Sequence, residues 1–186
     1  MPLPPPAERT LTHTRNIETH GYRRADGLWD IEGRLTDVKT FDKPAGDGAR
    51  AVKAGTPVHE MWLRLTIDSD YLIHDVAAAT DSAPFSLCAT VPPDFTRLKG
   101  ERMSRGFNRR VQQLVGGTVG CTHLRELVGR LANTAHQTMY EVRTKRDGPR
   151  DLASGQAILD TCRAYAADSP IVQERWPSLY TGPRSN

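Results

Sequence analysis

Two stretches of alternating apolar and polar residues constrain the fold of this chain more than any other feature. Residues 29–36 place Trp, Ile, Gly and Leu at the odd positions and charged or polar residues at the even ones. Residues 58–68 place Met, Leu, Leu and Ile at successive odd positions from 61 to 67. A period of two is that of a strand with one buried face. Asp37 and His59 share the odd parity, so both are predicted to face the buried side.

Turn signals join these strands to a third. Asp26-Gly27 predicts a turn before the first strand, and Asp68-Ser-Asp70 predicts a hairpin after the second. Residues 71–80 then have apolar residues on one side and read as a further strand. Residues 13–25 are polar and basic, and we assign no strand to them. The pattern predicts an antiparallel meander of about three strands.

After Asp81 the apolar spacing changes to three and four residues, the period of amphipathic helices. One such stripe covers residues 103–115 and ends at Gly116-Gly117, and a longer one runs from Cys121 to about Arg143. A last helix, capped by Asp151 or Ser154, is predicted to end at Asp168-Ser-Pro170. Strands followed by three or four packing helices predict an α+β fold.

The domain organisation follows from length and composition. Residues 1–12 are proline-rich without periodicity and are expected to form a disordered arm. Residues 13–182 are expected to form a single α+β domain, and residues 183–186 a frayed tail. Of the 186 residues, 38% are hydrophobic and 25% are charged, which is typical of a globular protein.

The same totals exclude several classes of protein. No run approaches the roughly 18 apolar residues of a membrane span, and the first residues lack the blocks of a signal peptide, so we expect a cytoplasmic protein without membrane contact. The three widely spaced cysteines argue against a disulfide framework. A net charge of +3 does not by itself indicate nucleic-acid binding. Neither the small-molecule or protein partner nor the oligomeric state, a homodimer included, is readable from these residues.

The glycine-rich turn before the long helix is the segment whose residues most strongly indicate a chemical function. It holds Gly116, Gly117 and Gly120 and delivers Cys121 and His123 to the helix start. Unpaired amides and the helix dipole favour a thiolate or a bound anion there. We therefore take the three glycines as candidates for cofactor binding and Cys121 with His123 as candidates for catalysis.

A metal site is the first interpretation of these side chains. Thiolates and imidazoles suit zinc or an iron–sulfur centre, and four of them form the shell that zinc prefers. The candidate ligands are Cys121, His123, Cys88 and His59, with Cys162 as the spare. Asp37 joins them, because a buried carboxylate must be paired or bind a cation. The alternative is that the thiols are simply buried as small apolar groups.

A metal-independent cysteine enzyme acting on a small anionic or thioester substrate is the second interpretation. Cys121 would be the nucleophile, with His123, His59 or His136 as base and Asp37 or Glu60 orienting that base. Because residues two apart on a helix do not face each other, we expect the base to come from another element. Whether the protein is an enzyme at all stays open.

A non-catalytic binding module is the third interpretation. The glycine turn and four nearby arginines could bind an anion or a nucleotide, although the P-loop motif is absent. RNA binding is disfavoured, because no aromatic residues that could stack on bases lie among these arginines. The four are Arg102, Arg105, Arg109 and Arg110.

Four segments carry a family resemblance. They are GYRRADGLWDIEGRL at 21–35, HEMWLRL at 59–65, GCTHL at 120–124, and the region from Cys162 to Trp176-Pro177. Through them the chain resembles an uncharacterised bacterial family of unknown function. Residues 57–142 are also distantly similar to iron–sulfur scaffold proteins of the NifU/IscU type, because a helix of those proteins opens on a segment like Cys121-Thr-His-Leu124. This resemblance implies a NifU/SufE-like fold with a shallow metal site between a strand start, a middle loop and a helix start.

The leading hypothesis is therefore a metal-binding protein of the zinc or iron–sulfur type. It would be a small metalloenzyme or an accessory factor of a catabolic pathway.

Overall fold

A computed structural model describes residues 3–146 and 159–183 of the chain. The chain divides into two compact units, Met1–Thr138 and Met139–Asn186. The first unit contains the sheet and the candidate site. The predicted caps of the last helix, Asp151 and Ser154, lie outside the described residues.

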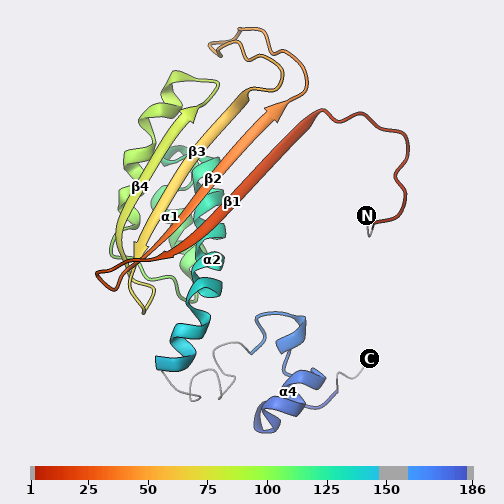
Figure 1. Ribbon diagram of the computed structural model, residues 1–186, viewed down its shortest axis with the longest axis vertical. Coiled ribbons are helices and arrows are strands. Elements are labelled where there is room, and N and C mark those ends of the chain that lie inside the picture. Colours follow the sequence, from red (N-terminus) through yellow and green to blue (C-terminus); the bar gives the residue numbers. More distant parts are fainter. Residues whose placement is uncertain (1–2, 147–158, 184–186) are drawn as a thin grey trace. The chain divides into compact units, whose positions relative to one another are not determined.

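The first unit is built on one antiparallel sheet of four strands (Figure 1). The strands follow one another in space in the order of the chain: β1 (His13–Arg23), β2 (Trp29–Lys39), β3 (Pro57–Ile67) and β4 (Ile73–Ser82). The hairpin turns lie where the sequence predicts them, with Gly27 at φ 86° between β1 and β2. The α+β fold with an antiparallel meander is confirmed, with four strands in place of about three.

The strand missing from the prediction is β1, at the edge of the sheet. Its odd residues, Arg15, Ile17, Thr19 and Gly21, share the face on which α2 lies, and only one of the four is apolar. Arg15 bonds Glu126 of α2 through an ion pair of 2.8 Å. Because polar side chains satisfy one another on this face, β1 lacks the apolar alternation by which a strand is recognised.

Helices cover one face of the sheet, as Figure 1 shows. The 3₁₀ turns η1 (Ser86–Thr90) and η2 (Pro92–Leu98) follow β4 and lead to α1 (Phe107–Val115). A third 3₁₀ turn, η3 (Gly117–Val119), joins α1 to the long helix α2 (Thr122–Arg146). The two predicted helical stripes are confirmed, but α1 begins at Phe107 rather than near Met103.

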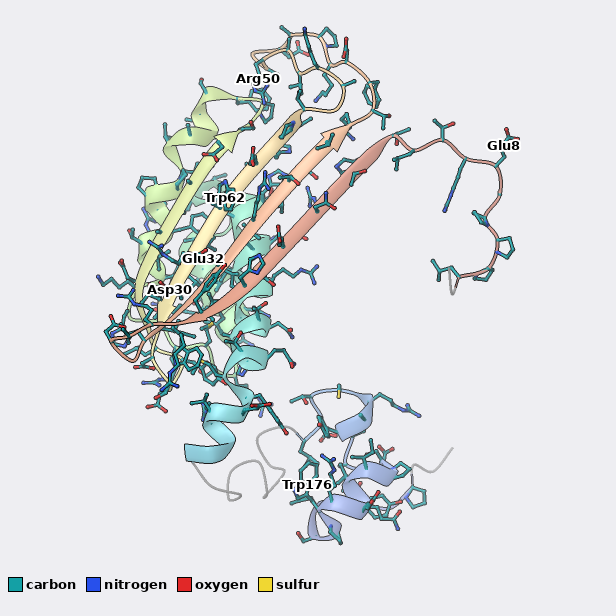
Figure 2. The ribbon with its side chains drawn as sticks, in the orientation of Figure 1. Glu8, Asp30, Glu32, Arg50, Trp62 and Trp176 are labelled. Atoms are coloured by element: carbon teal, nitrogen blue, oxygen red, sulfur yellow. The ribbon has the colours of Figure 1, made fainter. Side chains whose placement is uncertain are left out.

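The core lies between α2 and the odd-numbered face of the sheet. Ile31, Leu35 and Met61 are fully buried there, as are Leu127 and Leu131 of α2. The opposite face is polar, and Figure 2 shows Asp30, Glu32 and Trp62 on it. Two-residue alternation thus separates a buried face from a wet one, as expected.

Glycines on the buried face let α2 approach the sheet closely. A Cβ placed on Gly33 of β2 would lie 2.9 Å from Cδ2 of Leu131, and one on Gly21 of β1 would lie 2.1 Å from Oγ1 of Thr138. Contacts this short force a shift of the side chain or the helix. The two glycines therefore set the distance between α2 and the first two strands.

Apart from the end of α2, the described residues of the second unit form short helices only. They are η4 (Arg163–Tyr165), α4 (Pro170–Arg175) and η5 (Pro177–Leu179). The prediction that Asp168-Ser-Pro170 ends a helix is wrong, because this segment begins α4. The Ser169 hydroxyl accepts a hydrogen bond of 3.2 Å from the Val172 amide, and proline is favoured at the first helical position.

The helices in the described part of the chain include none that is both long and apolar enough to cross a membrane.

Candidate functional site

A buried carboxylate at the end of β2 is the centre of the candidate site. Asp37 is only 3% exposed and pairs in register with Arg15 of β1 on one side and His59 of β3 on the other. The three side chains therefore project from neighbouring strands on one face. The register between β2 and β3 shifts only after Asp37, between Asp37 and Val38. This irregularity therefore does not turn the Asp37 side chain outward.

Both oxygens of Asp37 accept several hydrogen bonds. Oδ1 accepts from Nε of Arg15 at 2.8 Å and lies 2.8 Å from Nε2 of His13. Oδ2 accepts from Nη2 of Arg15 at 2.7 Å and lies 3.0 Å from Nδ1 of His59. The paired guanidinium is the two-point geometry that holds a carboxylate most firmly. Asp37 is thus the acceptor for side chains from β1 and β3, the two strands that flank β2.

These contacts determine the charge of Asp37. Burial by itself raises its pKa, but the hydrogen bonds from Arg15 and His13 and the charge of Arg15 lower it more. The net pKa lies far below the usual range of a carboxyl group. Asp37 is therefore a permanent anion inside the fold.

The start of α2 brings a third imidazole to this anion, after those of His13 and His59. Nε2 of His123 lies 3.5 Å from Oδ2 of Asp37, and the rings of His123 and His59 are 3.9 Å apart between centroids. Asp37, His59 and His123 each offer a ligand atom, and these three atoms lie within 4.8 Å of one another. The structure therefore joins β2, β3 and α2 at one small cluster.

Both histidines have a pKa below the ordinary value. Burial is the largest cause for each, because it penalises the charged imidazolium. The hydrogen bond to Asp37 opposes this shift at His59, and the neighbouring His59 adds to it at His123. At neutral pH the cluster therefore consists of one carboxylate and two neutral imidazoles.

Cys121 lies at the edge of this cluster. Its Sγ is 3.8 Å from Nδ1 of His123, the ring nitrogen that faces away from Asp37. The prediction that these two residues do not face each other is wrong. Because α2 begins at Thr122, Cys121 lies just outside the helix and the helical spacing rule does not apply to the pair.

The remaining predicted site residues lie elsewhere. Cys88 is part of η1, and Cys162 is an exposed residue of the second unit, just before η4. Neither belongs to the cluster of Asp37, His59 and His123.

The glycines of the turn have packing roles between α1 and α2. A Cβ on Gly116 would lie 2.3 Å from the carbonyl oxygen of Gln112, and one on Gly120 would lie 2.0 Å from that of Val115. Gly117 has a φ of 60°, a conformation that L side chains rarely adopt. The turn therefore needs glycine at all three positions to place Cys121 and His123, whether or not it binds a cofactor.

Sequence reasoning missed the two β1 residues of the site, His13 and Arg15. The available signal was a weak one, because the odd positions 15, 17 and 19 hold Arg, Ile and Thr. This pattern predicts a strand only if polar side chains are accepted on the face of the strand that packs against the rest of the protein. Their role becomes clear once β1 is paired with β2.

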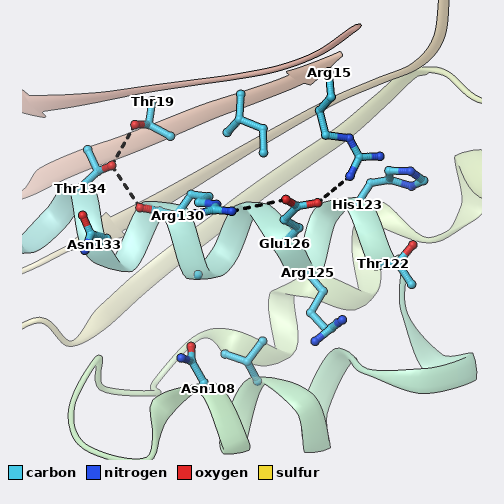
Figure 3. A pocket seen from close by; sticks show the side chains of 13 residues that line it. Arg15, Thr19, Asn108, Thr122, His123, Arg125, Glu126, Arg130, Asn133 and Thr134 are labelled. Atoms are coloured by element: carbon cyan, nitrogen blue, oxygen red, sulfur yellow. Dashed lines mark hydrogen bonds and ion pairs between the residues drawn. The ribbon is translucent and has the colours of Figure 1, made fainter. Parts of the chain in front are cut away.

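A polar groove adjoins the cluster. It lies between β1, α1 and α2 and has a volume of about 1270 Å³. Figure 3 shows Arg15 and His123 at one end, with Arg125, Arg130 and Asn133 along α2. Glu126 in its wall is engaged by Arg15 at 2.8 Å and by Arg130 at 3.7 Å. The groove thus shares Arg15 and His123 with the site around Asp37.

Comparison with known proteins places this arrangement in a family. Residues 13–137, which include all four strands and the cluster, match the family described as "Protein of unknown function (DUF2889)". The chain belongs to this family. The expected resemblance to a family of unknown function is therefore confirmed, and the matched region ends within α2. No curated protein and no solved structure matches the chain, so similarity to NifU/IscU-type scaffolds stays an expectation.

Proposed function

We propose that this member of the DUF2889 family binds a divalent metal ion, with zinc as the first choice, at Asp37, His59 and His123. One observation carries the proposal: Oδ2 of Asp37 lies 3.0 Å from Nδ1 of His59 and 3.5 Å from Nε2 of His123. Zinc bonds of about 2.0–2.1 Å in a tetrahedron separate neighbouring ligand atoms by about 3.3–3.4 Å. Both carboxylate–imidazole distances are therefore close to what zinc requires, and the two imidazole nitrogens lie within 4.8 Å of each other.

The protonation states support the same proposal. A metal ion needs deprotonated ligands, and here the carboxylate is ionised while burial favours the neutral form of both imidazoles. Arg15 opposes metal binding, because its Nη2 already donates a hydrogen bond to Oδ2 of Asp37 and its positive charge would repel the metal ion. Arg15 would keep its bond from Nε to Oδ1 and its ion pair with Glu126 while Oδ2 turned to the metal.

Three protein ligands favour a catalytic over a structural metal site. Structural zinc sites are closed by four protein ligands, whereas catalytic sites leave a position for water or substrate. Cys121 faces Nδ1 of His123 and not the ligating Nε2, so it lies outside the proposed coordination shell. A bound zinc ion would supply a polarised water or a Lewis acid at this position. The chain would then be a small metalloenzyme or a metal-binding accessory factor.

Metal content of the purified protein tests the proposal. We expect about one zinc per chain and a saturable site after metal removal, with binding weakened at least tenfold in His59→Gln and in His123→Gln. His20→Gln is the matched control, because His20 is an exposed β1 residue that pairs with Glu18. Folded His59→Gln and His123→Gln proteins that bind zinc as the wild type does would refute the proposed site.

A cysteine-dependent reaction is the second candidate, favoured by one specific geometry. Sγ of Cys121, both nitrogens of His123 and Oδ2 of Asp37 form a chain with steps of 3.8 Å and 3.5 Å. This is the order of nucleophile, base and orienting carboxylate in thiol enzymes. The two candidates share His123, whose Nε2 binds either the metal or Asp37.

Alkylation by iodoacetamide separates the two candidates. If Cys121 is a nucleophile, its alkylation in metal-free protein near neutral pH is fast and slows at least tenfold in His123→Gln. Cys162 is the internal control, because it is exposed and lies outside the cluster. Equal rates at Cys121 in wild type and His123→Gln would eliminate the thiol mechanism. Mass spectrometry of the separate peptides reports each rate.

A further inference from the structure

The groove beside the cluster differs from an ordinary surface depression in its charge. Its wall contains three arginines, Arg15, Arg125 and Arg130, against the single carboxylate of Glu126. Glu126 is already engaged by Arg15 and Arg130. Within residues 3–146 and 159–183 the structure gives the Arg125 side chain no carboxylate partner. The groove therefore has an excess of positive charge, located at Arg125.

The position of Arg125 directs that charge into the groove. Figure 3 shows its side chain extending from α2 toward α1, where Asn108 lies. Arg125 and His123 are two residues apart in α2 and both line the groove, with Arg125 on its α1 side. A guanidinium in this setting matches the planar, two-oxygen shape of a carboxylate.

Gly129 gives the groove an open floor. It is a glycine in the interior of α2, where glycine is the least favourable residue after proline. The glycines at 21 and 33 are required by close packing, but a Cβ on Gly129 would meet nothing within 4 Å. The residues that the structure describes therefore give no packing reason for glycine here. A ligand passing over the helix at this point does give one.

The groove is also longer than a single functional group such as a carboxylate. Its α2 wall runs from Thr122 to Thr134, which is about 18 Å of helix at 1.5 Å per residue. Beyond Gly129 the wall is lined by the amide of Asn133, while Ile17 of β1 supplies apolar surface. Such a groove suits an extended molecule with one charged end and an apolar body with a polar tip.

We propose that this groove binds an extended organic carboxylate, with its carboxylate on Arg125 and its body running over Gly129 toward Asn133. The carboxylate would then lie in the groove that His123 also lines, which names a substrate class for the proposed site. The inference rests on the proposed function only for the claim that the bound carboxylate is a substrate of the site at His123. Binding of the carboxylate itself needs no metal.

Octanoate and its neutral analogue octanamide are the probes, titrated into isotope-labelled full-length protein after metal removal. We expect octanoate to shift the amide resonances of Asn108, Gly129 and Asn133 saturably, and octanamide to bind at least tenfold more weakly. Arg125→Gln should lower octanoate affinity about tenfold, the effect of losing a charged hydrogen-bond partner. Arg109→Gln, an exposed change on α1 outside the groove, should leave the affinity unchanged.

Chain length gives a second, independent readout. Gly129→Leu should weaken octanoate at least fivefold while changing butyrate less than twofold, because only the longer body reaches the added side chain. Equal binding of octanoate and octanamide, an unchanged affinity in Arg125→Gln, or shifts confined to other regions would each overturn the proposal. Zinc binding by Arg125→Gln is measured in parallel. A failure of the metal site with intact octanoate binding refutes the metal and leaves the groove.

Discussion

Oδ2 of Asp37 lies 3.5 Å from Nε2 of His123, so the end of β2 and the first turn of α2 meet at one carboxylate. His59 of β3 reaches the same oxygen at 3.0 Å, and Arg15 of β1 at 2.7 Å. Groups from β1, β3 and α2 thus share one buried anion on β2. This sharing makes Asp37 the residue through which stability and the proposed metal binding are coupled.

Replacement of Asp37 by asparagine should destabilise the first unit. The change keeps the shape but removes the negative charge from Arg15, His13 and His59, so we expect a loss of about 2 kcal/mol in unfolding free energy. Urea denaturation measures it. Glu32→Gln is the control, because the Glu32 side chain is partly exposed and contacts Arg64 only at 3.5 Å, and the change should alter stability by less than about 0.5 kcal/mol. Equal effects of the two changes would contradict a central role for Asp37.

Stability of the metal-free protein should fall as the pH falls below about 6.5. Burial lowers the folded-state pKa of His59 and His123, so the unfolded chain takes up protons before the folded one does. Stability is therefore complete above the unfolded pKa and is lost as the pH drops from there toward the folded pKa. Unfolding free energies from about pH 7.5 to about 5.5 measure the slope. The His59→Gln/His123→Gln double variant should have a smaller slope, and an unchanged slope would refute the assignment.

Replacing Gly33 by alanine should lower the stability of the protein more than the same substitution at a glycine with no close neighbours. A methyl group on Gly33 would lie 2.9 Å from Cδ2 of Leu131, whereas one on Gly46 would meet nothing within 4 Å. Both Gly→Ala changes reduce the entropy of the unfolded chain similarly, so that gain cancels in the comparison. We expect Gly33→Ala to be less stable than Gly46→Ala by about 1 kcal/mol or more. Thermal unfolding of the two variants decides it.

Loss of the Ser169 cap should loosen α4 in the second unit. The hydroxyl accepts from the Val172 amide at 3.2 Å and donates to the Ala164 carbonyl at 2.6 Å. Ser169→Ala should therefore cost about 1 kcal/mol locally, seen as faster hydrogen exchange at the Val172 amide. Ser178→Ala, at an exposed serine of η5, should leave this exchange rate unchanged. Protection that is the same in both variants would mean that the cap contributes little.

The local sequence pattern was sufficient to predict the strands and helices that bury an apolar stripe. β2 and β3 follow from their two-residue alternation, and α1 and α2 from apolar residues every three or four positions, because each must bury one face. β1 has no such stripe, since Arg15 and Thr19 face Glu126 and Thr134 of α2 and need no apolar partner. An edge strand of this kind becomes visible only with its partners in place.

By itself the sequence determined which residues face inward, including Asp37 and His59, and which residues begin the long helix, including His123. Parity and helical spacing are local properties of the backbone, so they are readable in one dimension. Only the tertiary structure decided that these three side chains meet and that Cys88 and Cys162 lie outside their cluster. Register across β1, β2 and β3 and the docking of α2 on Gly33 depend on contacts between residues distant in sequence, and no local period encodes such distances.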